Sequence, residues 1–73
     1  MNTSSTDRML TRVKSIYLFI RKKGIVETEE LVEEFGITHR TIQRDLNILS
    51  HYSLVKSPKR GYWKATSKRV KVN

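Results

Sequence analysis

Cysteine is absent from this chain of 73 residues. Its absence excludes disulfide bonds, thiolate metal ligands and a cysteine nucleophile together, and it favours a reducing compartment. Long hydrophobic runs are absent too, because the longest uninterrupted apolar stretch, Ile16 to Ile20, is far shorter than the ~20 residues of a membrane-spanning helix. Residues 1–6 are polar where a secretory signal would be apolar. We therefore predict a cytoplasmic protein without a membrane partner.

Residues suited to catalysis are equally scarce. The histidines, His39 and His51, stand far apart in the sequence, and most carboxylates gather between Glu29 and Glu34 rather than beside either of them. No catalytic triad or metal-ligand spacing results from this pattern. The glycines at positions 24, 36 and 61 are too dispersed to form a phosphate-binding loop. We expect no enzyme activity, no metal and no cofactor.

Acidic residues are nearly missing from the second half of the chain. Overall, 15 Lys and Arg residues stand against 7 Asp and Glu residues, which gives a net charge of +8 and a pI near 10.2. Residues 1–36 hold six basic and six acidic side chains, whereas residues 37–73 hold nine basic side chains and Asp45 alone. Such one-sided basic charge is typical of a nucleic-acid-binding surface, although a merely soluble basic domain would also show it.

The length and the pattern predict one domain over residues 6–66, preceded by a flexible start at 1–5 and followed by a basic tail at 67–73. Thr6 or Asp7 can cap a first helix, which should end before Gly24. Apolar residues recur along it at helical spacing: Met9, Val13, Ile16, Tyr17 and Ile20. Its basic residues could add phosphate contacts, but the nearby glutamates favour a solvated face for Arg8, Arg12, Lys14 and the Arg21-Lys22-Lys23 cluster.

A helix-turn-helix is predicted over about residues 28–51. Residues 25–27 are β-prone, and Thr28 offers a cap for a second helix that ends near Phe35. Gly36 suits a left-handed turn, and Thr38 can cap the next helix at once. Ile42, Leu46 and Leu49 then form a narrow apolar stripe along that third helix.

After about Tyr52 the period changes to that of strands. Residues 54–56 and 62–66 flank a turn-rich segment that contains Pro58 and Gly61, which predicts a β-hairpin, the wing, over about 54–66. Leu54 and Trp63 are its expected inward residues, although Trp63 could alternatively stack on a base. The fold class is therefore mainly α with a small β-hairpin, a three-helix winged helix-turn-helix.

The third helix carries the candidate base-contacting residues. Arginine can bind guanine O6 and N7, and asparagine or glutamine can bind adenine in the same bidentate way. An α-helix turns by 100° per residue, which places four side chains opposite the apolar stripe: Arg40, Arg44, Asn47 and His51. Gln43 lies at the edge of this outer face. We predict base contacts from Arg40, Gln43, Arg44 and Asn47. The alternative is an ordinary solvated helix surface.

Other residues are candidates for contact with the DNA backbone. Thr28 and Thr38 begin helices, whose free N–H groups can bind phosphate, and basic side chains occupy the wing. The predicted set is Thr28, Thr38, His39, Thr41, Lys59, Arg60 and Lys64. Asp45 would repel phosphate, so we expect it to point sideways into an ion pair or hydrogen bond that orients a neighbouring helix.

Residues 26–49 resemble the DeoR-type helix-turn-helix of bacterial transcription regulators. The resemblance lies in Phe35-Gly36-Ile37-Thr38 and in Thr41-Ile42-Gln43-Arg44-Asp45-Leu46, which match the family pattern almost position by position. It implies a winged helix with a recognition helix at residues 38–47 that docks in the major groove. Gln43 stands where the family usually has arginine, and the wing has a single glycine, Gly61, where the family usually has a pair.

The resulting hypothesis is a small transcriptional regulator that binds double-stranded DNA sequence-specifically. Regulators of the family typically continue into a sugar-phosphate-sensing domain, and we expect neither that domain nor a small-molecule effector site in this chain. Two alternatives stay open: a protein-interaction module that docks on an acidic partner, and RNA binding. A two-fold homodimer is compatible with the sequence, since palindromic operators suit paired helix-turn-helix units.

Overall fold

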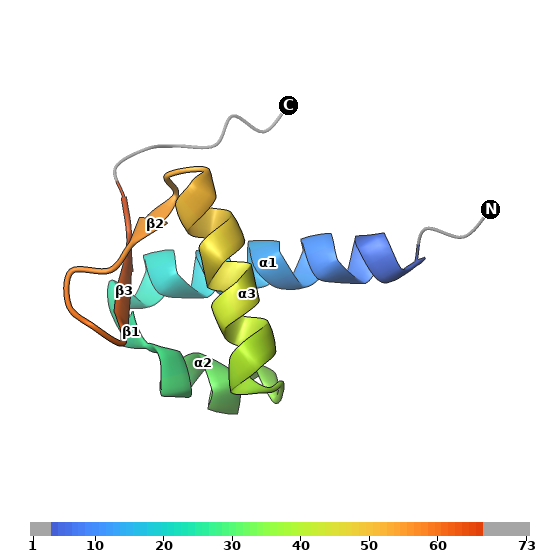
Figure 1. Ribbon diagram of the computed structural model, residues 1–73, viewed down its shortest axis with the longest axis horizontal. Helices are drawn as coiled ribbons and strands as arrows, with labels where there is room; N and C mark the ends of the chain where they lie inside the picture. The colour runs from blue at the N-terminus through green and yellow to red at the C-terminus, as the bar shows by residue number, and fades with distance from the viewer. Residues whose placement is uncertain (1–3, 67–73) are drawn as a thin grey trace.

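The computed structural model describes the backbone of residues 4–66 and the side chains of residues 9–66. Three helices and a small sheet follow in the order α1 (Ser4–Lys23), β1 (Ile25–Glu27), α2 (Thr28–Phe35), α3 (His39–His51), β2 (Val55–Lys56) and β3 (Tyr62–Ala65). Figure 1 shows α3 crossing α1, with the sheet at the carboxyl-terminal end of α1. The predicted winged helix-turn-helix is thereby confirmed. The predicted tail at 67–73 lies outside the described residues.

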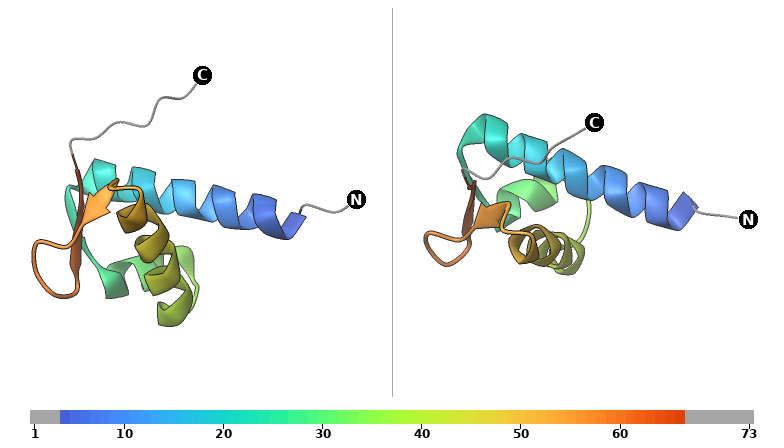
Figure 2. Two further views of the ribbon diagram at one scale, coloured as in Figure 1. Left: turned by 45° about the horizontal axis from the view of Figure 1, so that its top comes forward. Right: turned by 90° about the horizontal axis from the view of Figure 1, so that it is seen from above.

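The helix α1 supplies one side of the core. The predicted stripe is confirmed, because Val13, Ile16, Tyr17 and Ile20 are buried and Met9 is partly buried. However, α1 already begins at Ser4, so the prediction that Thr6 or Asp7 caps it is wrong, and both residues lie within the helix. Figure 2 shows that the amino-terminal half of α1 extends beyond the rest of the domain.

The helix-turn-helix forms as the sequence predicts. Gly36 ends α2 in the left-handed region at φ 62°, and its N–H donates to the Val32 carbonyl at 2.9 Å. The Thr38 hydroxyl then caps α3 by accepting a hydrogen bond from the Thr41 N–H at 3.2 Å. The apolar stripe of α3 is buried against α1 and α2: Ile42, Leu46 and Leu49. This burial fixes which face of α3 remains at the surface.

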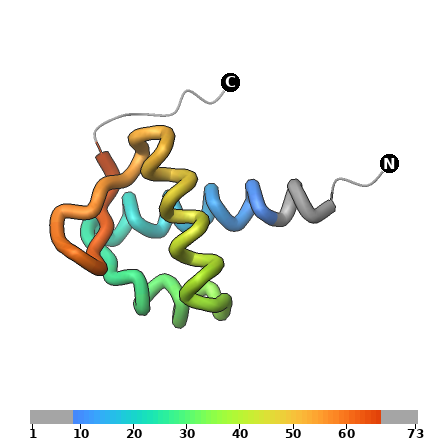
Figure 3. Tube along the Cα trace, viewed as in Figure 1, coloured from blue at the N-terminus to red at the C-terminus, as the bar shows by residue number. Residues whose placement is uncertain are grey.

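The sheet contains one strand more than the predicted hairpin. β2 and β3 pair antiparallel as predicted, and β1 pairs with the other edge of β3, which gives the order β1-β3-β2. Val55 is the fully buried residue of the hairpin, whereas Leu54 and Trp63, the predicted inward residues, are only partly buried against the core. The trace in Figure 3 shows the turn between β2 and β3 projecting from the sheet.

Thr28 does not cap α2, so that prediction is wrong. Glu27 occupies the cap position without a side-chain hydrogen bond. The buried Thr28 hydroxyl instead accepts a hydrogen bond from Trp63 Nε1 at 3.0 Å and donates to the Gly61 carbonyl at 3.3 Å. The pairing of β1 with β3 causes this, because it brings the start of α2 against the wing. Thr28 therefore ties the wing to the helix-turn-helix.

Candidate nucleic-acid interface

The outer face of α3 presents the four predicted base-contacting residues together. Arg40, Arg44 and Asn47 are exposed and Gln43 is half-buried. They line one shallow groove together with His39. Their position follows from the helix period, since burial of the apolar stripe turns these residues outward. Whether they contact bases stays a prediction.

Gln43 and Asn47 form an amide pair on this face. Gln43 Nε2 donates to Asn47 Oδ1 at 3.1 Å, across one turn of the helix. The bond leaves Gln43 Oε1 as an acceptor and Asn47 Nδ2 as a donor. An adenine edge in the major groove offers the complementary N6 donor and N7 acceptor. The pair therefore presents one acceptor and one donor that complement those of an adenine edge.

Asp45, the single acidic residue of α3, is turned away from the outer face. Its side chain has 0% exposure and forms a bidentate ion pair with Arg12 of α1, in which Arg12 Nε binds Oδ2 and Nη2 binds Oδ1 at 3.0 Å. The hydrogen bond to this carboxylate raises the pKa of the Arg12 guanidinium above its ordinary value. The sideways orientation predicted for Asp45 is confirmed. The solvated face predicted for Arg12 is wrong, because its guanidinium is bound to Asp45. The local pattern could not indicate this partner, since it lies 33 residues away in the sequence.

The amino terminus of α3 holds three of the predicted backbone-contacting residues. Thr38 Oγ1 donates to Thr41 Oγ1 at 3.1 Å, so the two hydroxyls are linked at the surface. His39 is exposed, and its Nε2 lies 3.6 Å from Glu29 Oε2. Thr28, by contrast, donates its backbone N–H to the Gly61 carbonyl at 3.0 Å. The N–H of Thr28 itself therefore already has a partner, and contact of Thr28 with the DNA backbone stays a prediction.

The wing brings one of its basic residues, Arg60, beside α3. Lys59 and Arg60 are exposed in the turn, which is closed by a hydrogen bond from the Tyr62 N–H to the Lys59 carbonyl at 2.9 Å. Gly61 follows with φ 84°, a left-handed conformation that glycine adopts cheaply. A groove between the wing and α3 is lined by Glu27, Thr28, Glu29, His39, Gln43, Arg60 and Gly61. Arg60 is thus placed beside the residues of α3.

Lys64 lies apart from that groove. It sits in β3 and is half-buried, directly opposite Lys56 of β2. Two like charges at opposed positions destabilise a sheet unless an anion lies between them. Lys56 was not among the predicted contacts, although its place one residue after Val55 puts it on the outer face of the sheet by simple alternation.

A further groove extends the outer face of α3 toward its carboxyl terminus. It is lined by Arg44, Asn47, Ile48, His51 and Tyr52. The rings of His51 and Tyr52 meet edge to face with their centroids 5.2 Å apart. Tyr52 is 60% exposed and was not predicted as part of the site, although continuing the helical steps from Arg44 would have found it.

Within residues 4–66, no helix has the length and apolar character needed to cross a membrane. Among the side chains that the structure describes, those of residues 9–66, no three from His, Cys, Asp or Glu are placed to hold a metal ion together.

The fold and this surface define a winged helix-turn-helix domain. Residues 12–62 match the DeoR-like helix-turn-helix domain family. This chain belongs to that family, whose members are transcription regulators.

The chain is similar to two proteins whose names refer to transcriptional regulation. The chain is 65% identical over 68 residues to the uncharacterized HTH-type transcriptional regulator YtzE of Bacillus subtilis (strain 168), and the match covers 93% of each protein. It is 43% identical over 44 residues to the glycerol-3-phosphate regulon repressor of Escherichia coli (strain K12), a match that covers 60% of this chain and 18% of the repressor. No solved structure matches the chain.

Proposed function

We propose that this protein is a transcriptional regulator that binds double-stranded DNA sequence-specifically, with α3 in the major groove. The observation that carries the proposal is the outer face of α3. Arg40, Gln43, Arg44 and Asn47 share that face, and the one carboxylate of the helix is buried in an ion pair. A major groove about 12 Å wide accommodates a single helix of this kind.

Each residue has a distinct part in the proposal. Arg40 and Arg44 bind guanine O6 and N7 in a bidentate way, and the Gln43–Asn47 pair binds adenine. The neutralised Asp45 matters equally, because an uncompensated carboxylate in the middle of α3 would repel the phosphates on both sides of the groove. The ion pair with Arg12 also anchors α3 to α1, so the outer face is held at a fixed angle.

The remaining basic and polar residues hold the DNA backbone in this account. Thr38, His39 and Thr41 surround the amino terminus of α3, where N–H groups and the helix dipole favour phosphate. Lys59 and Arg60 of the wing reach the neighbouring backbone or minor groove. Lys64 and Lys56 form a separate basic pair on the sheet, and a phosphate between them would relieve their repulsion.

The names of the two relatives support this role, since one is called a regulator and the other a regulon repressor. A protein that acts in this way works in the cytoplasm, beside the bacterial chromosome.

The test is a binding titration with a labelled pool of random duplex DNA. Binding is measured by fluorescence anisotropy at a series of salt concentrations. We expect affinity to fall steeply with salt, with a logarithmic slope of about −0.9 per phosphate contacted, and sequencing of the retained duplexes to return a defined site. The variant Arg40→Ala/Arg44→Ala should lose most of the binding. Lys22→Ala, which removes an exposed charge from the last turn of α1, is the control that should bind as wild type.

Absence of binding at low salt by a protein with a folded circular dichroism spectrum would overturn the proposal. Equal competition by duplex RNA would point to RNA instead. Binding to an acidic protein partner without any duplex binding would support the interaction-module alternative.

A further inference from the structure

One face of α1 is apolar and uncovered. Leu10 and Leu18, about two helical turns apart, are 58% and 49% exposed. Both line a cavity of about 350 Å³ between α1, the end of α3 and the start of β2. This volume lies within the ~300–1,000 Å³ of ordinary binding pockets. The cavity, which we call the α1 groove, is lined by Leu10, Val13, Lys14, Tyr17, Leu18, Arg21, Leu49 and Leu54.

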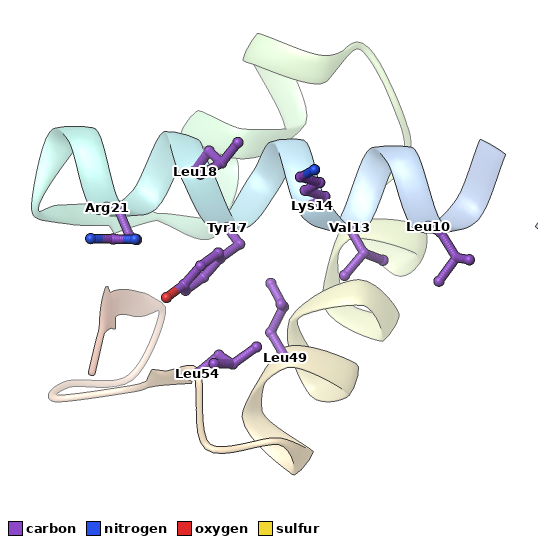
Figure 4. A pocket seen from close by; sticks show the side chains of 8 residues that line it. All are labelled: Leu10, Val13, Lys14, Tyr17, Leu18, Arg21, Leu49 and Leu54. Atoms are coloured by element: carbon purple, nitrogen blue, oxygen red, sulfur yellow. The ribbon is translucent and has the colours of Figure 1, made fainter. Parts of the chain in front are cut away.

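The α1 groove has an apolar floor and a basic rim. Figure 4 shows Tyr17 pointing from α1 toward Leu49 and Leu54. Lys14 and Arg21 are the charged residues of the described lining, and both are exposed. Because that lining includes no carboxylate, the groove attracts an occupant that is apolar along its middle and negatively charged at its edge.

A buried hydroxyl without a partner lies at one end of the α1 groove. Tyr17 is buried, and its hydroxyl has no hydrogen-bond partner among the described residues, although buried polar groups normally have one. The Arg21 guanidinium lies over the same ring, 5.7 Å from its centroid. A carboxylate held by Arg21 therefore offers the kind of acceptor that the Tyr17 hydroxyl lacks.

The rim charge argues against an occupant from this chain itself. The segment that follows the sheet is basic, with Lys68, Arg69 and Lys71, so the rim would repel it. A second copy that approached through α1 would bring the same basic rim. Its acidic helix α2 cannot cover the leucines instead, because the apolar side of α2, with Leu31, is buried in its own core. The occupant is therefore a different, acidic molecule.

The shape of the α1 groove favours a helix as the occupant. From Leu10 to Arg21 the lining follows α1 for eleven residue steps, about 16 Å. Figures 1 and 2 show no other described element beside the amino-terminal half of α1, so a partner helix has room along it. Amphipathic helices bind such grooves by laying an apolar stripe against the floor. Acidic residues beside that stripe would meet Lys14 and Arg21.

We propose that the α1 groove binds an amphipathic helix of another protein, one whose apolar stripe is flanked by acidic residues. The stripe covers Leu10 and Leu18, while Lys14 and Arg21 pair with the flanking carboxylates and keep their aliphatic stems over the apolar floor. The groove shares no lining residue with the outer face of α3, so the proposal does not rest on DNA binding. If the proposed function also holds, the partner is carried to the DNA site with the regulator.

The experiment is a selection from a display library of random peptides of about 16 residues, long enough for about four helical turns. The full chain is the bait, and peptides that also bind the double variant Leu10→Ser/Leu18→Ser are discarded. This step removes acidic peptides that bind elsewhere on the basic protein. We expect the retained sequences to be rich in Asp and Glu, with apolar residues at helical spacing.

The best retained peptide is then titrated against variants by fluorescence anisotropy, without DNA. Leu18→Ser should weaken binding about tenfold, because it removes apolar area that the peptide covers. Its matched control is Ile25→Ser, since Ile25 is similarly exposed, at 53%, but does not line the groove. Arg21→Gln should weaken binding about threefold, more at low salt than at high salt. Lys22→Gln, an exposed charge of α1 outside the lining, should bind as wild type.

Circular dichroism establishes that each variant is folded. The proposal would be overturned if no peptide preferred wild type to the double variant, or if the retained peptides were basic or uncharged. A loss at Ile25→Ser as large as the loss at Leu18→Ser would also contradict it. Failure of the DNA proposal gives a different result, because duplex binding would then be absent while the peptide still bound the α1 groove.

Discussion

The ion pair between Arg12 and Asp45 gives a prediction whose magnitude depends on which partner is removed. Asp45 has 0% side-chain exposure, whereas Arg12 keeps 27%. Replacing Arg12 by Met preserves the aliphatic packing but leaves a buried carboxylate without its counterion, which costs about 3–5 kcal/mol. Replacing Asp45 by Asn leaves a guanidinium that can turn toward water, so we expect a smaller loss of about 1–3 kcal/mol.

These losses are large for a small domain. The total free energy of unfolding is about 5–15 kcal/mol for ordinary domains, and a chain of this size lies toward the lower end. Arg12→Met should therefore shift the midpoint of urea unfolding strongly, and Asp45→Asn should shift it less. The assay is urea titration followed by circular dichroism and by the fluorescence of Trp63, the single tryptophan.

A double variant completes the test. Arg12→Met combined with Asp45→Leu removes both charges and fills the site with apolar side chains, so this variant should be more stable than Arg12→Met alone and close to wild type. Equal midpoints for Arg12→Met and wild type would refute the reasoning, because the buried carboxylate would then not need its partner.

Three further predictions concern residues that hold the helix-turn-helix in place. Gly36→Ala should lower the free energy of unfolding, measured by urea titration, by about 1 kcal/mol, because φ is 62° at this position. An added Cβ meets no atom within 4 Å, so the loss comes from the backbone conformation alone. An unchanged midpoint would count against the left-handed turn. Thr28→Val removes the hydroxyl that binds Trp63 Nε1 and should cost about 1–3 kcal/mol and alter the tryptophan emission, whereas an unaltered spectrum would contradict that contact. The hydrogen bond with Lys23 Nζ, at 2.7 Å, lowers the pKa of Glu30 below its ordinary value of 4.5. The pair therefore stabilises the fold above that value, and this contribution is lost as pH falls through the lowered pKa. Lys23→Ala should return the pKa of Glu30, measured by NMR, toward 4.5, and a pKa that does not move would exclude the pair in solution.

Local features of the helix-turn-helix were predictable from the sequence. The apolar stripe of Ile42, Leu46 and Leu49, the left-handed turn at Gly36 and the cap at Thr38 all depend on neighbours within a few residues. The same periodicity placed Arg40, Arg44 and Asn47 outward before any tertiary contact was known. These features follow from backbone geometry that the local sequence determines.

Contacts between distant segments were not predictable in the same way. Thr28 has the residue type and position of a helix cap, yet its hydroxyl binds Trp63, 35 residues later, because β1 joins the hairpin as a third strand. Arg12 likewise matches a solvated basic residue until Asp45 is placed beside it. No local period encodes which strand pairs with which or which charge faces which. The groove that joins Arg60 to His39 and Gln43 arises from the same long-range pairing.

The most direct test of the account is the sequence preference of Arg44→Ala on the site recovered from the duplex pool. We expect Arg44→Ala to lose about 1–3 kcal/mol in binding and to relax the preference at one base-pair position. Arg44→Lys keeps the charge but not the bidentate geometry, so it should relax the same position. Lys22→Ala should leave both affinity and preference unchanged. If Arg44→Ala instead weakens all duplexes equally, or binds as wild type, α3 does not contact bases through Arg44 and the central claim is contradicted.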